Sequence, residues 1–105
     1  MPQPLREPTF LILTALAGGP LHGYGLIAEV DRLSDGRVSL RPGTLYGTLD
    51  RLTDDGHVTA DREEIVDGRL RRYYRLTPDG VQAARSALAR AYRGARTPRP
   101  LGGPA

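Results

Sequence analysis

The sequence predicts a small, mainly α-helical domain with one β-hairpin, in the order helix, helix, helix, strand, strand, helix. Apolar residues recur at helical spacing in three successive stretches of the first half. The pattern changes to alternation over residues 57–76, and a helix start with proline in its first turn follows at Thr77. This order of elements is that of a winged helix-turn-helix, with the hairpin as its wing.

A chain of 105 residues suffices for one domain with a modest core. It has no cysteine, which excludes a disulfide framework and a thiolate metal site. No apolar run is long enough to span a bilayer and no leader precedes the first helix, so we expect a cytoplasmic protein without membrane contact. We expect neither a cofactor nor a metal.

All fifteen basic residues are arginine, and the net charge is +3. Arginine binds phosphate and guanine edges bidentately, although a GC-rich genome would produce the same bias. The charge is unevenly placed, because residues 1–36 hold two arginines and four acids while residues 77–105 hold five arginines and one acid. We therefore expect one side of the protein to face a polyanion.

The first helix is expected after a flexible arm at residues 1–6, with the folded domain over residues 7–93. It is apolar on almost every side between Phe10 and Ala17. Such a helix must be covered on every side, which one small core rarely achieves. We expect one face to pack inward and another to meet a second subunit; the alternative is a helix at the centre of a monomer.

The second helix is expected over residues 21–33. Gly23 and Gly25 weaken its start by about 1 kcal/mol each relative to alanine, which indicates close approach of a neighbouring helix or a DNA phosphate. His22 is expected to cap or pack rather than to ligate.

The third helix, within residues 41–56, is amphipathic. Leu45, Leu49 and Leu52 recur at i, i+4 and i+7 and form one stripe that should face the core. We expect Thr44 to cap the first turn. The opposite side presents small, polar and aromatic side chains, as a recognition helix in a DNA major groove does, or as an ordinary surface helix would.

The hairpin strands are expected at residues 57–62 and 70–76, with a turn at Asp67-Gly68. Their parity places Tyr74 and Leu76 inward with Val58. Four arginines within seven residues make the second strand a basic wing; they are Arg69, Arg71, Arg72 and Arg75.

The last helix should begin with Thr77 as its N-cap and Pro78 in its first turn. Its alanines permit close packing, in the core or at a dimer seam. Residues 94–105 hold three prolines and three glycines and are expected to be a disordered basic tail.

Three segments also resemble one known family. They are GPLHGYGLIAEV at residues 19–30, LRPGTLYGTLDRLTDDGHV at residues 40–58 and RRYYRLTPDG at residues 71–80. In this order and spacing the chain is similar to the PadR family of bacterial transcriptional regulators, in its short form without a long C-terminal domain.

The resemblance implies a homodimeric repressor on a pseudo-palindromic operator in double-stranded DNA, with half-sites about 34 Å apart. It implies major-groove contacts from the third helix and backbone or minor-groove contacts from the wing. The DNA-binding residues would be Tyr24, Arg41, Thr44, Tyr46, Gly47, Thr48, Asp50, Arg51, Arg69, Arg71 and Arg72. The dimer interface, between first and last helices, would include Phe10, Leu11, Leu13, Leu88, Ala91 and Tyr92.

Two features depart from the family. Asp50 stands where members often carry a basic residue, so it would accept a hydrogen bond from cytosine or pair with Arg51 or Arg41. The chain has no tryptophan to stack a drug-like effector at the dimer centre. A small-molecule effector, if one binds, would contact Phe10, Tyr92 and aliphatic residues of the first and last helices.

The sequence gives an enzyme or a metal sensor little support, because it has no cysteine nucleophile and its two histidines are far apart. The competing hypothesis is a winged helix that binds another protein instead of DNA. The modest net charge and the acidic pair at Asp54-Asp55 favour that alternative.

Overall fold

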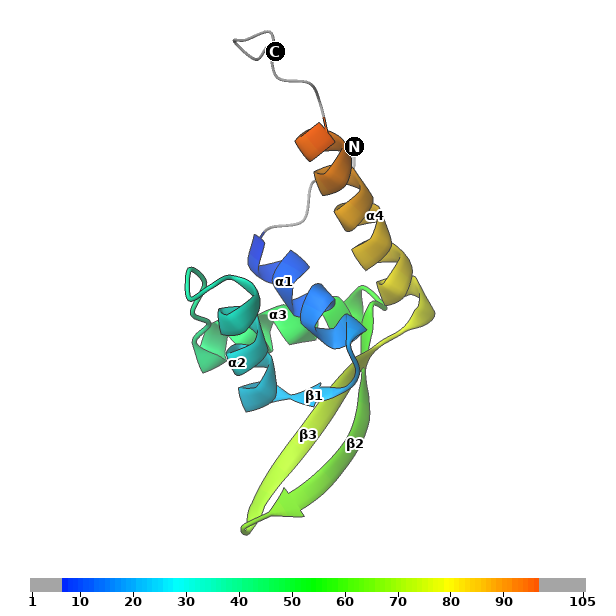
Figure 1. Ribbon diagram of the computed structural model, residues 1–105. Coiled ribbons are helices and arrows are strands. Elements are labelled where there is room, and N and C mark those ends of the chain that lie inside the picture. The colour runs from blue at the N-terminus through cyan, green and yellow to red at the C-terminus, as the bar shows by residue number, and fades with distance from the viewer. Residues whose placement is uncertain (1–6, 97–105) are drawn as a thin grey trace, which may run out of the picture.

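The computed structural model describes residues 7–96, with the side chains of 94–96 excepted. The expected arm at residues 1–6 and the tail from residue 97 onward lie outside the described residues. The elements are α1 (Glu7–Ala17), β1 (Leu21–His22), α2 (Gly23–Leu33), α3 (Pro42–Asp54), β2 (Val58–Val66), β3 (Arg69–Leu76) and α4 (Pro78–Arg96) (Figure 1). The predicted order of four helices and a hairpin is confirmed, β1 is an addition, and α4 continues three residues into the expected tail.

α1 is the central helix of the core. It packs against α2, α4 and β3, and Ile12 and Leu13 have no exposed surface. Leu11 is also buried, at 8% exposure. The expectation that Leu11 and Leu13 meet a second subunit is therefore wrong, because the surrounding elements of the same chain already cover them.

The leucine stripe of α3 closes the core from one side, as predicted. Leu45, Leu49 and Leu52 are each at most 2% exposed. Burying a leucine side chain is worth about 1.5–3 kcal/mol, so these three contacts fix the rotation of α3 about its own axis. That rotation decides which side chains of α3 remain at the surface.

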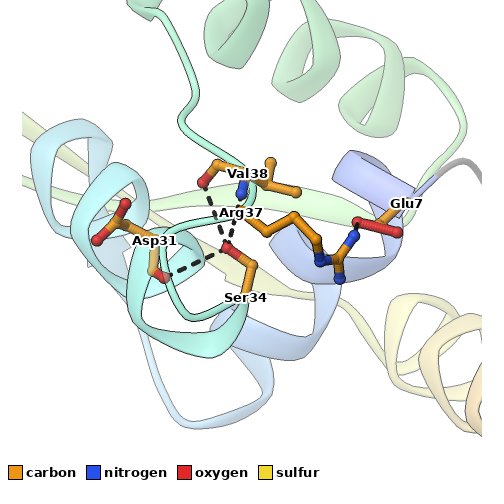
Figure 2. Close-up of polar contacts among 5 residues, drawn as sticks. All are labelled: Glu7, Asp31, Ser34, Arg37 and Val38. Carbon is orange, nitrogen blue, oxygen red and sulfur yellow. Dashed lines mark hydrogen bonds and ion pairs between the residues drawn. The ribbon is translucent and has the colours of Figure 1, made fainter.

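The turn between α2 and α3 is held by a small polar network (Figure 2). The buried Ser34 hydroxyl oxygen accepts the backbone N–H of Val38 at 2.9 Å and its hydroxyl lies 3.3 Å from the Asp31 carbonyl. Arg37 forms an ion pair with Glu7 in the first turn of α1. The network sets where the chain enters α3 relative to the other two helices.

The start of α3 differs from the prediction. Its N-cap is Arg41, in extended conformation and without a side-chain capping bond, and Pro42 is the first helical residue. Thr44 therefore lies inside the first turn and does not cap it. The end is as predicted, with Asp55 as C-cap and Gly56 at φ 80°.

The sheet is antiparallel, in the order β1-β3-β2 (Figure 1). Tyr74 and Leu76 pack on the core and Val58 is buried, so the predicted parity is confirmed. β1 pairs Leu21 with Tyr74 and His22 with Tyr73. This two-residue edge strand is too short to produce an alternating pattern in the sequence. A register shift between residues 60 and 63 marks an irregularity of the β-bulge type in β2.

Gly80 allows the first turn of α4 to pack closely against His57 in the segment that follows α3. Thr77 caps α4 by accepting the Gly80 N–H at 3.0 Å, and a Cβ on Gly80 would lie 2.0 Å from the His57 carbonyl oxygen. We expect Gly80→Ala to lower the free energy of unfolding by about 1–3 kcal/mol, because backbone must move to admit the methyl group.

Gly47 is the matched control, because nothing lies within 4 Å of a Cβ built there. Gly47→Ala should raise the free energy of unfolding by about 0.5–1 kcal/mol through helix propensity. Urea denaturation of both variants measures the difference. Equal effects would contradict the described contact at Gly80.

Candidate nucleic-acid interface

A cleft of about 190 Å³ lies where the start of α2, the first turns of α3 and the outer half of the hairpin converge. The structure thus brings together five of the residues predicted to contact DNA, from three separate elements. The lining residues are His22, Gly23, Tyr24, Tyr46, Arg69, Leu70, Arg71 and Arg72. Aromatic hydroxyls and guanidinium groups dominate this lining, which suits a phosphate backbone.

Gly23 explains how α3 fits against the start of α2. A Cβ on Gly23 would lie 2.3 Å from the Tyr46 hydroxyl oxygen and 3.0 Å from the ring carbon that carries it. The close approach predicted for the glycines at the start of α2 is therefore made at Gly23 by a side chain of α3, whereas the nearest atoms at Gly25 belong to Leu21 and His22. Tyr46 remains 45% exposed, with its hydroxyl end at the cleft.

The start of α2 is an electropositive wall of the cleft. His22 caps the helix as predicted, because its Nδ1 accepts the N–H of Gly25 at 3.1 Å. Backbone N–H groups at a helix N-terminus carry partial positive charge and favour anions. Tyr24 is 69% exposed in this first turn, so its hydroxyl is available as a donor.

The wing is less basic than its arginine content predicts. Arg72 pairs with Glu63 at 2.9 Å, and Arg75 pairs with Asp61 at 3.3 Å. The hydrogen bond and charge of Glu63 raise the pKa of Arg72. The neutralising acids, Glu63 and Asp61, both lie on β2. This strand continues to Val66, beyond the expected end at residue 62, so Glu63 was expected in the loop and not opposite Arg72.

Arg69 and Arg71 differ from the other wing arginines. Neither forms an ion pair within the part of the chain that the structure describes, and both line the cleft. Among the described residues, these two wing arginines can therefore contact an external anion without first breaking an ion pair with a carboxylate.

Tyr73 ties the wing to the start of α2. Its ring packs edge-on against His22 at 5.2 Å between centroids, and the Arg62 guanidinium lies 4.0 Å from its centroid. Its hydroxyl donates to Glu64 at 2.7 Å, and that bond raises the pKa of Tyr73. Tyr73 is thus half-buried among polar partners.

The predicted contact residues of α3 divide into two groups. Thr44, Tyr46, Gly47 and Asp50 are exposed, as is Arg41 at the helix entrance. Asp50 pairs with neither Arg41 nor Arg51 in the described structure.

Thr48 and Arg51 differ from these residues, because Thr48 is buried and Arg51, although exposed, bonds to another element of the chain. Thr48 is only 7% exposed, so the expectation that it contacts DNA is wrong: it lies beside the leucine stripe. Arg51 donates to the Thr9 hydroxyl of α1 at 2.9 Å, so its guanidinium is turned toward the core helix.

An apolar groove of about 480 Å³ lies away from the cleft, between the end of α1, the end of β3 and α4. Leu88 lines this groove. Leu88 and Tyr92, which lies one turn further along α4, are each 59% exposed. Phe10 and Tyr92, expected at an effector site, are not among the lining residues of this groove.

Within residues 7–96 no helix is long and apolar enough to cross a membrane, and no His, Asp and Glu cluster is placed to hold a metal.

A model of the family described as "Transcriptional regulator PadR-like family" matches residues 12–86, which include every lining residue of the cleft. The chain belongs to this family. This PadR-like chain is 47% identical over 72 residues to Transcriptional regulator Rv3488 of Mycobacterium tuberculosis, a stretch that covers 69% of this chain and 64% of that protein. It is 36% identical over 58 residues to Transcriptional regulator YqjI of Escherichia coli, covering 55% of this chain and 28% of that protein.

Solved structures share the fold of this PadR-like chain. Bacillus subtilis PadR in complex with operator DNA superposes with a TM-score of 0.69 at 28% identity, covering 79% of this chain and 47% of that one. A PadR-like transcription factor from Bacteroides fragilis gives 0.71 at 27% identity, covering 85% and 84%. The chain spans less than two thirds of the length of the M. tuberculosis and E. coli relatives.

The contact between Gly23 and Tyr46 is testable by a double-mutant cycle. Gly23→Ala should lower the free energy of unfolding by about 1–2 kcal/mol, because the tyrosine hydroxyl must leave its place. In a Tyr46→Ala background the same change should cost little, giving a coupling energy on the order of 1 kcal/mol. Additive effects of the two changes in urea denaturation would contradict the contact.

Proposed function

We propose that this PadR-like protein is a sequence-specific, double-stranded-DNA-binding repressor of transcription that acts in the cytoplasm as a homodimer on a pseudo-palindromic operator. The observation that carries the proposal is that the α2 start, the exposed first turns of α3 and two wing arginines converge on one cleft, and that these arginines have no ion-pair partner among the described residues. The structural likeness to a PadR solved with operator DNA supports it.

In this proposal α3 enters the major groove with Thr44, Tyr46, Gly47 and Asp50 toward the base edges. Gly47 has no side chain, so it permits close approach of the helix backbone to the DNA. Asp50, without an internal ion-pair partner among the described residues, accepts a hydrogen bond from cytosine N4.

The remaining contacts position the protein on the sugar–phosphate backbone. Arg41 stands at the entrance of α3, while Tyr24, Arg69 and Arg71 line the cleft beside it. These groups donate to phosphate oxygens, which gives affinity without sequence information. Arg72 would contribute only by releasing Glu63.

The homodimer in this proposal forms through α4, with Phe10 of α1 at its edge. Leu88 and Tyr92 are both 59% exposed, and Ala91 beside them is exposed and small. Two copies related by a twofold axis would place their α3 helices about 34 Å apart, one turn of DNA. A small-molecule effector would enter the apolar groove next to Leu88 and change that spacing.

The protein-binding alternative rests on the acids of β2, which pair with half of the wing arginines. Salt dependence separates the two functions, because affinity for DNA falls linearly in log salt with a slope set by the number of phosphates neutralised, whereas salt acts on charged protein contacts only through screening.

The phosphate contacts of the wing arginines are tested on duplexes that the wild-type protein selects from a random-sequence library. Arg69→Ala/Arg71→Ala should reduce the slope of log affinity against log salt by about 0.9 for each phosphate that the variant no longer neutralises. The control Asp61→Ala/Arg75→Ala removes a wing ion pair without changing net charge, and Arg62, which also pairs with Asp61, keeps Glu64 as a partner, so the slope should stay close to that of the wild type. Fluorescence anisotropy measures both.

Failure to select any sequence, together with a flat salt dependence, would overturn DNA binding and leave the protein-binding alternative. Equal slopes for the two double variants would contradict the distinction between paired and unpaired wing arginines.

The dimer seam is tested by Leu88→Glu/Tyr92→Glu. Placing two charges in an apolar contact should halve the molar mass measured by light scattering and weaken operator binding, while helix content by circular dichroism stays unchanged. Arg90→Glu on the same helix is exposed and should leave the mass unchanged. A double variant with wild-type mass would show that α4 is not the seam.

A further inference from the structure

The end of the hairpin carries an exposed apolar pair that the packing of the domain does not use. Ile65 on β2 and Leu70 on β3 stand directly opposite each other and are 74% and 62% exposed. Figure 1 shows this end of the hairpin projecting away from the helices. Two large aliphatic side chains that face each other across a projecting tip can stabilise the hairpin, but most of their apolar surface stays in water, which indicates an external partner.

The neighbours of the pair indicate which partner this is. Leu70 lines the cleft together with Tyr24 and Tyr46, so the pair begins at the candidate interface. Arg69 and Arg71 flank Leu70 along β3, and neither forms an ion pair within the described residues. By strand alternation the two arginines lie on the other face of the hairpin from Leu70. A tip with an apolar face and cations on its other face is complementary to the sugar and base edges of a nucleic-acid groove between its phosphates.

We propose that Ile65 and Leu70 form an apolar wedge that enters the minor groove beside the α3 site and favours easily deformed base steps there. The proposal rests on the DNA-binding function proposed above. The minor groove is about 6 Å wide, so a two-stranded tip must open it. Opening costs least at A·T-rich and pyrimidine–purine steps, which makes the pair a source of sequence preference outside the major-groove contacts.

The turn that joins the two strands carries one acid. Asp67 and Gly68 have φ values of 52° and 75°, the left-handed pair that a tight hairpin turn needs. Asp67 supplies this conformation but places a negative charge at the tip, which would meet the phosphates flanking the groove. Asparagine adopts the same conformation without the charge, so Asp67→Asn reports whether the tip lies near DNA.

The experiment uses the full chain and the duplexes selected by the wild-type protein. Ile65→Thr/Leu70→Thr keeps strand propensity and charge, and removes the apolar surface. We expect about tenfold weaker binding, no change in salt slope, and loss of base preference at the positions flanking the α3 site in a repeated selection. Arg69→Ala/Arg71→Ala is the contrast, because it should change the slope.

Asp67→Asn should tighten binding several-fold at low salt and steepen the salt slope, because it removes a charge that repels phosphate. Wild-type affinity and wild-type flanking preference in the threonine variant would overturn the wedge, while the arginine variant would still report DNA binding. An Asp67→Asn variant that binds like the wild type would overturn it independently. A wild-type protein that selects no sequence would instead overturn the proposed function itself.

Discussion

The burial of the leucine stripe of α3 is the constraint on which the rest of the arrangement depends. Leu45, Leu49 and Leu52 can leave water only in one rotation of the helix, and that rotation exposes the opposite face. The Ser34 network and the Glu7–Arg37 ion pair fix the position of the chain as it enters α3 (Figure 2). A surface suited to a groove is thus a consequence of core packing.

A second set of contacts holds the wing to the start of α2. β1 lies directly before α2 and pairs with β3, so His22 both caps α2 and packs on Tyr73 of the wing. The start of α2 and the hairpin therefore cannot move independently without breaking this contact. The acids of β2 hold part of the wing charge internally, which leaves Arg69 and Arg71, beside the cleft, as the wing arginines without an ion pair among residues 7–96.

Features that depend on local spacing were predictable from the sequence: the α3 stripe, the Thr77 cap, the hairpin parity and the capping role of His22. Features that depend on which segments meet were not. The two-residue β1 has no periodicity of its own, and the cross-strand partners of Arg72 and Arg75 depend on a register shift that composition does not reveal. The apolar periphery of α1 suggested a second subunit, but α2, α4 and β3 cover Leu11 and Leu13. Thr48 was misplaced because a polar residue next to the stripe can be buried without disturbing the pattern.

In the proposed complex α3, the α2 start and the wing engage one DNA together. Hydroxyl-radical footprinting of the wild-type protein on its selected duplex tests this most directly, because it reports backbone protection nucleotide by nucleotide. We expect two protected half-sites about one helical turn apart, each with protection on both sides of the major groove and across the adjacent minor groove. A single protected segment without minor-groove protection, or no protection at concentrations that saturate binding, would contradict it.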